Sequence, residues 1–157
     1  MIKMIKKQWR RFRYVIKDLD GNPYLIRYRL IVTKWGCVYL HHIIRSDGDR
    51  ELHDHPFNFT VILLWRGYVE YSHALGKPFG KVKQVSRWCG WLSVIRHKAT
   101  DAHRLELYNG PVWSLFIRGP KIREWGFYLD NKDWVTNQYY HEFKQKEKDD
   151  KGIQPRR

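Results

Sequence analysis

Short strand-like runs separated by turn signals make up most of this 157-residue chain. In several of them apolar and polar side chains alternate, and Gly, Pro, Asn and Asp cluster between them, which is typical of strands with one buried face. So many short strands at close spacing predict an all-β domain, either an antiparallel sandwich or a closed barrel. The predicted strands are 24–32, 37–44, 61–71, 81–88, 91–96, 102–108, 112–118 and 124–129, with a further strand around His53.

The two ends of the chain differ from its body. Residues 1–13 form a basic segment with helical character over 6–13, and 137–157 form a charged tail that is weakly helical over 137–149. Between them, 14–136 is long enough to bury a single core, so we expect one domain. Because the sequence has no apolar run of about 18 residues and no apolar signal peptide at its start, we expect a cytoplasmic protein without membrane association. Its two cysteines, Cys37 and Cys89, are expected to be free and buried.

Three histidines are spaced as in a metal site. His53 and His55 are separated by one residue, and alternate residues of a strand point to the same face, so both imidazoles can reach one point. His103 can supply a third ligand from another strand. The aromatic stretch 57–65 places the pair beside a buried strand, where neutral imidazoles need a partner. The alternative is that these are hydrogen-bonded core histidines without a metal. Asp54 points to the opposite face, where it orients a ligand or stabilises the fold.

These residues resemble the two sequence motifs of the cupin superfamily, whose members are small double-stranded β-helix (jelly-roll) barrels. The match to the first motif comes from Gly48, His53, His55 and Gly67, and the match to the second from Gly90 and His103. The segment 91–128 is similar to a group of small cupin-like proteins of bacteria and their phages. The resemblance covers roughly residues 45–130 and implies a jelly-roll barrel, in the host cytoplasm if the protein is phage-encoded. It says little about substrate, because one such barrel hosts many chemistries.

The chain departs from the cupin pattern at Thr60, where the first motif places an acidic ligand, and at 98–100, where the second has Pro-x-Gly. We therefore expect a three-histidine site with open positions for water, dioxygen or a chelating substrate. Three neutral imidazoles leave a 2+ charge on the site, which favours an anionic ligand. Resemblance to three-histidine cupin dioxygenases favours Fe(II) as the one divalent transition metal, and Mn, Ni, Zn and Cu also accept imidazole.

Candidate substrate-binding residues follow from the same barrel. If the strand face continues past Thr60, Arg66 lies toward the barrel mouth and can clamp a carboxylate or phosphate; the alternative is an exposed Arg at a strand end. Tyr68 and Trp65 can stack on a ring, although large aromatic side chains in a barrel usually belong to the core. Glu124 is a candidate catalytic base if it points inward, and a salt bridge with its basic neighbours is the alternative.

The remaining histidines are weaker candidates. His97 is a reserve fourth ligand, in a stretch that resembles a basic loop. Side chains of consecutive residues diverge in a strand, so at most one of His41 and His42 joins any site. His73 and His141 fall in turn and tail segments and are interpreted as incidental.

Positive charge is concentrated at the two ends of the chain. Of the net charge of +14, residues 1–13 contribute +6 and 144–157 contribute +3, which leaves +5 for the body. Basic ends attract polyanions through phosphate contacts, so nucleic acid is a candidate partner; the alternative is that they only aid solubility. The sheet edges also suggest a homodimer.

Two classes of function are consistent with these features. The first is a mononuclear metal-dependent enzyme of the non-haem oxygenase type that acts on a small anionic substrate. The second is a non-catalytic protein that binds a nucleotide-like anion or nucleic acid. A sugar-phosphate isomerase or epimerase is a further cupin activity that the abundant Arg and Lys keep open.

Overall fold

The computed structural model describes residues 12–18, 20–48, 51–73, 84–129 and 133–150. Twelve strands and one helix lie within them, and the all-β prediction is confirmed. The strands are β1 (Arg13–Lys17), β2 (Pro23–Val32), β3 (Cys37–Ile43), β4 (Leu52–His53), β5 (Phe59–Trp65), β6 (Tyr68–His73), β7 (Gln84–Cys89), β8 (Val94–His97), β9 (His103–Leu107), β10 (Val112–Arg118), β11 (Gly126–Tyr128) and β12 (Trp134–Thr136), and the helix is α2 (Asn137–Asp150).

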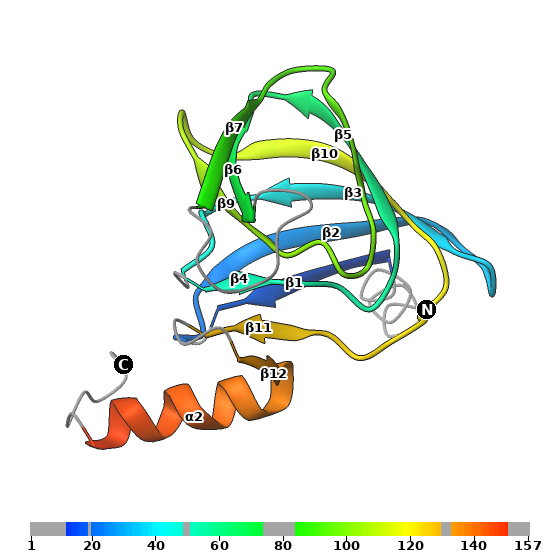
Figure 1. The fold of residues 1–157 in the computed structure, drawn as a ribbon. Helices are drawn as coiled ribbons and strands as arrows, with labels where there is room; N and C mark the ends of the chain where they lie inside the picture. Colours follow the sequence, from blue (N-terminus) through cyan, green and yellow to red (C-terminus); the bar gives the residue numbers. More distant parts are fainter. Residues whose placement is uncertain (1–11, 19, 49–50, 74–83, 130–132, 151–157) are drawn as a thin grey trace, which may run out of the picture.

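The strands form two six-stranded antiparallel sheets that curve around a shared interior (Figure 1). Sheet A has the order β1-β2-β3-β10-β5-β8, and sheet B has the order β12-β11-β4-β9-β6-β7. Buried and partly exposed residues alternate along β3 and β10, as expected for strands that cover a core with one face. The inner face is lined by a buried apolar cluster that includes Leu63, Val112 and Phe116. Cys37 and Cys89 are free and buried, as predicted.

A tight turn interrupts the strand predicted over 61–71. The structure has two strands there, β5 and β6, joined at Arg66 and Gly67. Arg66 has a φ of 60°, and a Cβ on Gly67 would lie 2.2 Å from the Cys89 carbonyl oxygen. The prediction that Arg66 continues the face of Thr60 toward the barrel mouth is therefore wrong, because the backbone reverses at this residue.

Strand β1 occupies part of the predicted N-terminal segment. It begins at Arg13 and pairs with β2 at the edge of sheet A. Residues 1–11, which hold most of the predicted helix over 6–13, lie outside the described residues.

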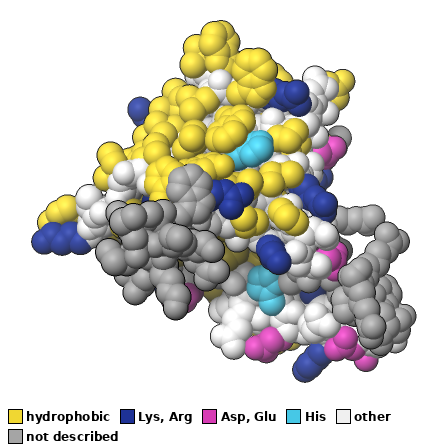
Figure 2. Space-filling model, turned by 180° about the vertical axis from the view of Figure 1, so that it is seen from behind, with side chains coloured by type: hydrophobic (Ala, Val, Ile, Leu, Met, Phe, Trp, Pro, Cys, Tyr) yellow, Lys and Arg dark blue, Asp and Glu magenta, His cyan; other side chains and the backbone are white. Residues whose placement is uncertain are grey.

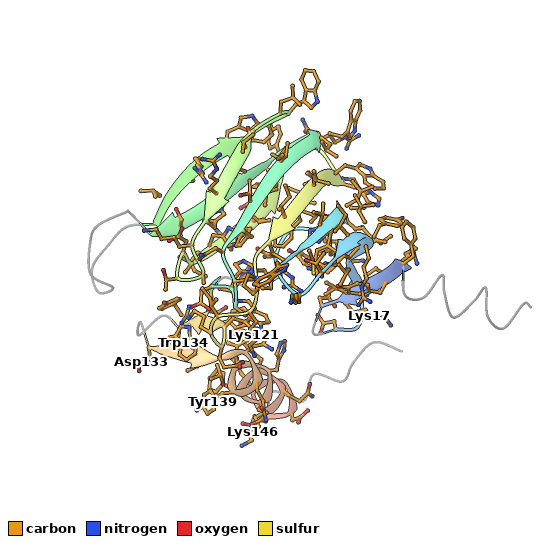
Figure 3. All side chains as sticks on the ribbon, turned by 90° about the vertical axis from the view of Figure 1, so that its right-hand side faces the viewer. Lys17, Lys121, Asp133, Trp134, Tyr139 and Lys146 are labelled. Carbon is orange, nitrogen blue, oxygen red and sulfur yellow. The ribbon has the colours of Figure 1, made fainter. Side chains whose placement is uncertain are left out.

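The charged tail contains helix α2, as the sequence predicted. Tyr140 is fully buried against the barrel, where its ring stacks on Phe127 with centroids 3.8 Å apart. Its hydroxyl donates to Glu51 Oε2 at 2.9 Å, and Lys144 donates to Glu51 Oε1 at 3.0 Å. Figure 3 shows Tyr139 on the same helix, below the barrel. Within the described ranges, no helix is long and apolar enough to span a membrane.

The outer face of sheet A is largely apolar. One row of register partners runs across β2, β3, β10 and β5 and consists of Tyr28, Leu40, Leu115 and Ile62. In the next row Trp113 stacks on His42, with ring centroids 4.3 Å apart, so the consecutive histidines His41 and His42 do diverge. Figure 2 shows hydrophobic side chains gathered over this side of the molecule.

Candidate metal centre

The structure brings His53, His55 and His103 together, and we refer to them as the histidine triad. Strands β4 and β9 are neighbours in sheet B, and His53 is the register partner of His103. One nitrogen from each of the three side chains lies within 4.8 Å of the others. The closest pair is Nε2 of His55 and Nε2 of His103, 2.8 Å apart. His103 is buried and the other two are half-buried, so the triad lies at the edge of the core.

A carboxylate that sequence reasoning missed lies directly behind the triad. Glu70 Oε1 is 2.6 Å from Nδ1 of His103 and 2.8 Å from Nε2 of His97. Its other oxygen, Oε2, accepts a hydrogen bond of 2.7 Å from Nε of Arg87. Glu70 is only 1% exposed, and it precedes by two residues Ser72, the register partner of His103. Residues two apart share a face of the sheet, which is why Glu70 reaches His103 diagonally.

His97 joins the cluster from the opposite sheet. It ends β8 in sheet A, its side chain is 7% exposed, and its ring centroid lies 4.6 Å from that of His103. The basic-loop interpretation of this residue was therefore wrong. Nε2 of His97 lies 2.8 Å from Glu70 Oε1 but has no hydrogen-bond partner among the described residues.

The charges in the cluster are set by burial and by hydrogen bonds. Burial lowers the pKa of His55 well below its ordinary value, and it also lowers the pKa of His103 although Glu70 opposes the change. Burial alone would raise the pKa of Glu70, but the His103 hydrogen bond and the nearby His97 hold it well below its usual range. At neutral pH Glu70 is therefore ionised and accepts the proton on Nδ1 of His103. The lone pair of His103 Nε2 then faces His55.

The donor atoms of the triad fit a divalent transition metal. Nitrogens that share one ion through bonds of about 2.1 Å lie about 3.0–3.4 Å apart, depending on geometry. The 2.8 Å between the two Nε2 atoms is close to that spacing. Glu70, His97 and His103 form a second group of potential ligands, also within 4.8 Å, but Arg87 already engages this carboxylate. A metal at the triad leaves the Glu70 contacts intact, whereas a metal at the second group must replace the hydrogen bond between Glu70 Oε1 and Nδ1 of His103.

Aromatic rings surround the triad. The ring of His53 lies 5.8 Å from Phe127 and 6.4 Å from Trp125 between centroids. The ring of His55 lies 4.5 Å from Phe59. These apolar neighbours cover part of the imidazoles of His53 and His55, and they contribute to the burial that lowers the pKa of His55.

Asp54, between the two neighbouring histidines, ties down three separate backbone segments. It has no exposed surface and accepts hydrogen bonds from the Gly126 backbone N–H at 2.8 Å and from Trp134 Nε1 at 2.9 Å. Arg123 also donates to it. Asp54 therefore anchors β4 to β11 and β12 and holds the turn that carries His55.

Four other predicted site residues do not lie with the triad. Trp65 is 61% exposed at the end of β5, and Arg66 donates to the Asn109 carbonyl at the adjacent turn. Tyr68 is 1% exposed and belongs to the core cluster. The side chain of Glu124 is 69% exposed and pairs with Lys121.

The position that lacks the acidic ligand faces away from the metal site. Thr60 is the register partner of Arg96 and Ile117 on the outer face of sheet A. The carboxylate nearest the triad comes instead from β6. A sequence signal was available: Glu70 is a lone acidic residue in an apolar strand, two residues from Tyr68 and therefore on its buried face.

No model of a known protein family matches the sequence, and no curated protein matches it. Solved structures match by shape. An Fe(II) form of HppE aligns with a TM-score of 0.50 and 12% identity over 68% of this chain and 56% of that chain. A candidate mannose-6-phosphate isomerase from Ralstonia eutropha JMP134 aligns with a TM-score of 0.51 and 14% identity over 64% of this chain and 88% of that chain. HutD from Pseudomonas fluorescens SBW25 aligns with a TM-score of 0.50 and 10% identity over 69% and 56%.

These three structures have the cupin fold, and the predicted jelly-roll barrel is confirmed by them. The chain spans little more than half the length of HppE and of HutD. At 10–14% identity the likeness establishes the fold alone.

Proposed function

We propose that this cupin-fold chain is an enzyme that binds one divalent transition metal through the histidine triad and acts on a small anionic substrate. The proposal depends above all on one observation. Nε2 of His55 and Nε2 of His103 converge at 2.8 Å, while Glu70 holds the opposite nitrogen of His103 at 2.6 Å. A histidine oriented by a carboxylate in this way is typical of metal sites in proteins.

When bound, a divalent metal with three neutral imidazole ligands supplies open coordination positions and a positive charge that polarises an anionic substrate. The chain's own residues prepare that site. Glu70 keeps the proton of His103 on Nδ1, and the rings of Phe59 and Phe127 cover part of the imidazoles. His97 lies beside the triad, with its Nε2 2.8 Å from Glu70 Oε1.

Within this class we favour a mononuclear non-haem Fe(II) oxygenase. Two features support it: imidazole is a ligand that Fe(II) accepts, and the fold is that of an Fe(II) protein, HppE. A sugar-phosphate isomerase is the second candidate, because 88% of the candidate mannose-6-phosphate isomerase aligns with this chain. Non-catalytic binding of an anion is the third candidate, and it requires no reaction at a metal.

Elemental analysis of chelator-free protein, alongside variants, tests the metal site first. We expect about one equivalent of metal in the wild type, none in His53→Ala and a retained but weaker site in Glu70→Gln. The second ligand group predicts the reverse order, in which Glu70→Gln loses the metal and His53→Ala keeps it. Absence of metal from the wild type, even after anaerobic reconstitution with Fe(II), would overturn the proposal.

The class of reaction is tested next on the metal-loaded protein. Oxygen consumption that depends on an added small carboxylate or phosphate and disappears in His103→Ala supports the oxygenase. Interconversion of sugar phosphates without oxygen uptake supports the isomerase. Binding of anions without either reaction supports the non-catalytic alternative.

A further inference from the structure

Two arginines on the inner face of sheet A have no carboxylate partner. These are Arg27 on β2 and Arg118 on β10, which we call the arginine pair. In the described part of the chain neither forms an ion pair. Arg27 donates from Nε to Nε2 of His41 and from Nη1 to the hydroxyl of Tyr14, both at 2.8 Å. Arg118 donates to the carbonyl of the next residue at 3.0 Å and to the Tyr39 hydroxyl at 3.4 Å.

The charges of the arginine pair are therefore uncompensated. The acceptors are an imidazole nitrogen, two hydroxyls and a backbone carbonyl. His41 stays neutral, because burial and then Arg27 lower its pKa well below the ordinary value. A guanidinium has five N–H groups, and each arginine uses only two of them in these hydrogen bonds. The donors that remain match the oxygens of a carboxylate or phosphate.

The arginine pair lies close to the histidine triad. Both guanidinium carbons contact the ring of Tyr39, Arg27 at 4.8 Å and Arg118 at 5.9 Å from its centroid. Arg118 also lies 4.8 Å from the ring of Phe57, whose centroid is 6.1 Å from that of His55. One aromatic ring therefore separates Arg118 from the triad, a distance that a small organic molecule can span.

A buried hydroxyl without a partner lies on the same inner face. Ser114 is 1% exposed, and its Oγ has no hydrogen-bond partner among the described residues. It is the register partner of His41, which in turn is the register partner of Arg27. Buried hydroxyls are nearly always hydrogen-bonded, so an unpaired one in the same row as Arg27 points to a ligand.

We propose that the arginine pair binds the acid group of a small organic anion, a carboxylate or a phosphate, and directs the rest of that molecule toward the histidine triad. The interpretation of this anion site as a substrate site rests on the proposed function. The alternative is that the arginines only stabilise the barrel by packing on Tyr39 and Phe57.

Calorimetric titration of the full chain with inorganic phosphate and with malonate, at constant ionic strength, tests the site. We expect Arg27→Gln and Arg118→Gln each to weaken binding of the preferred anion by at least about tenfold. Arg96→Gln is the matched control, because Arg96 is exposed on the outer face of sheet A and the same charge is removed there. We expect this control to stay within about twofold of the wild type.

The inference is overturned if neither anion binds the wild type, or if Arg96→Gln weakens binding as much as the two site variants. If thermal melting shows that the Arg27→Gln variant does not fold, the anion affinity of the Arg118→Gln variant decides the test. The same titration of His53→Ala separates this inference from the proposed function. Phosphate or malonate binding that depends on the arginine pair in a protein without metal supports the anion site and not the enzyme. If the protein binds metal and its anion affinities are unchanged by Arg27→Gln and Arg118→Gln, the metal site is supported and the anion site is refuted.

Discussion

Glu70 Oε1 lies 2.6 Å from Nδ1 of His103, on the side of the imidazole opposite its approach to His55. A carboxylate in this position fixes both the orientation and the tautomer of a ligand histidine. It does so from β6, one strand away, so the candidate metal site is built by three strands of sheet B together with the loop after β4.

Replacement of this carboxylate should weaken the metal site without abolishing it. We expect Glu70→Gln to reduce metal affinity by about 10–100-fold, since the amide cannot hold His103 through a charge-assisted bond. Competition with a chromophoric chelator measures the change. Glu106→Gln is the control, because Glu106 is half-exposed on β9 and pairs with Arg104. An affinity equal to that of the wild type would show that Glu70 has no part in the site.

The metal-free protein should lose stability as the pH falls through 6.5. Folding lowers the pKa of His55 and His103, whereas both titrate near 6.5 in the unfolded chain. Below that pH the unfolded chain takes up protons that the folded chain rejects, so the free energy of unfolding falls by about 1.4 kcal/mol per pH unit for each proton. Glu70 has a lowered pKa as well, and its contribution is lost only below about pH 4.5.

Urea unfolding between pH 8 and pH 5 checks this dependence. The double substitution His55→Gln and His103→Gln should make it shallower, and the remaining dependence should include the contribution of His41, whose pKa is also lowered by burial. A stability that is constant over this range would contradict the assignment of neutral, buried imidazoles.

Asp54→Ala should destabilise the fold by about 2–4 kcal/mol, because it removes the charged partner of Arg123 and the acceptor of the buried Gly126 N–H and of the partly buried Trp134 N–H. Chemical denaturation gives the value directly. The exposed pair of Glu124 and Lys121 provides the comparison: Glu124→Ala should change stability by less than about 0.5 kcal/mol and should leave metal content unchanged. Equal effects of the two substitutions would refute the role of Asp54 as an anchor.

The apolar outer face of sheet A should pair with a second copy of the chain. The central rows of register partners on this face carry almost no charge, so the face is better suited to contact an identical apolar face than a polyanion. Exposed apolar patches of this kind mark interfaces. Sedimentation velocity should show a dimer that Leu115→Lys converts to a monomer with an unchanged circular dichroism spectrum. A wild type that remains monomeric at high concentration would contradict this expectation.

Nucleic-acid binding through the basic ends stays a prediction. Residues 1–11 contain five basic residues and no acidic one. If they contact phosphates, their deletion should reduce the slope of log K against log salt by about four. Filter binding with duplex and single-stranded probes measures that slope. Absence of binding by the full chain at low salt would leave the basic ends with a solubilising role only.

The sequence predicted those parts of the fold and site that depend on local periodicity. Two histidines one residue apart share a strand face in any register, which is why His53 and His55 could be grouped before their strand partners were known. The strand-like run between the turn signals at 109–111 and 119–120 predicted β10 with its bounds unchanged. Helix α2 begins at residue 137, where the sequence predicted a weakly helical tail over 137–149.

The rest depends on contacts that local patterns do not encode. Glu70 reaches His103 only through the pairing of β6 with β9, and His97 reaches Glu70 only because sheet A faces sheet B. Arg66 was misplaced because its positive φ reverses the strand face. Arg27 escaped notice because an arginine in an alternating strand is normally on the exposed side, whereas here it shares the inner face with His41.

The anchoring of Asp54 has a consequence for how the protein is made. Its partners follow late in the chain, and Trp134 lies 80 residues beyond it. On a translating ribosome, His53 and His55 emerge long before the side chains that hold the turn between them. We therefore expect chains stalled ahead of residue 123 to release metal readily, and full-length chains to keep it. Metal capture would then be a late step of biosynthesis, governed by completion of the chain.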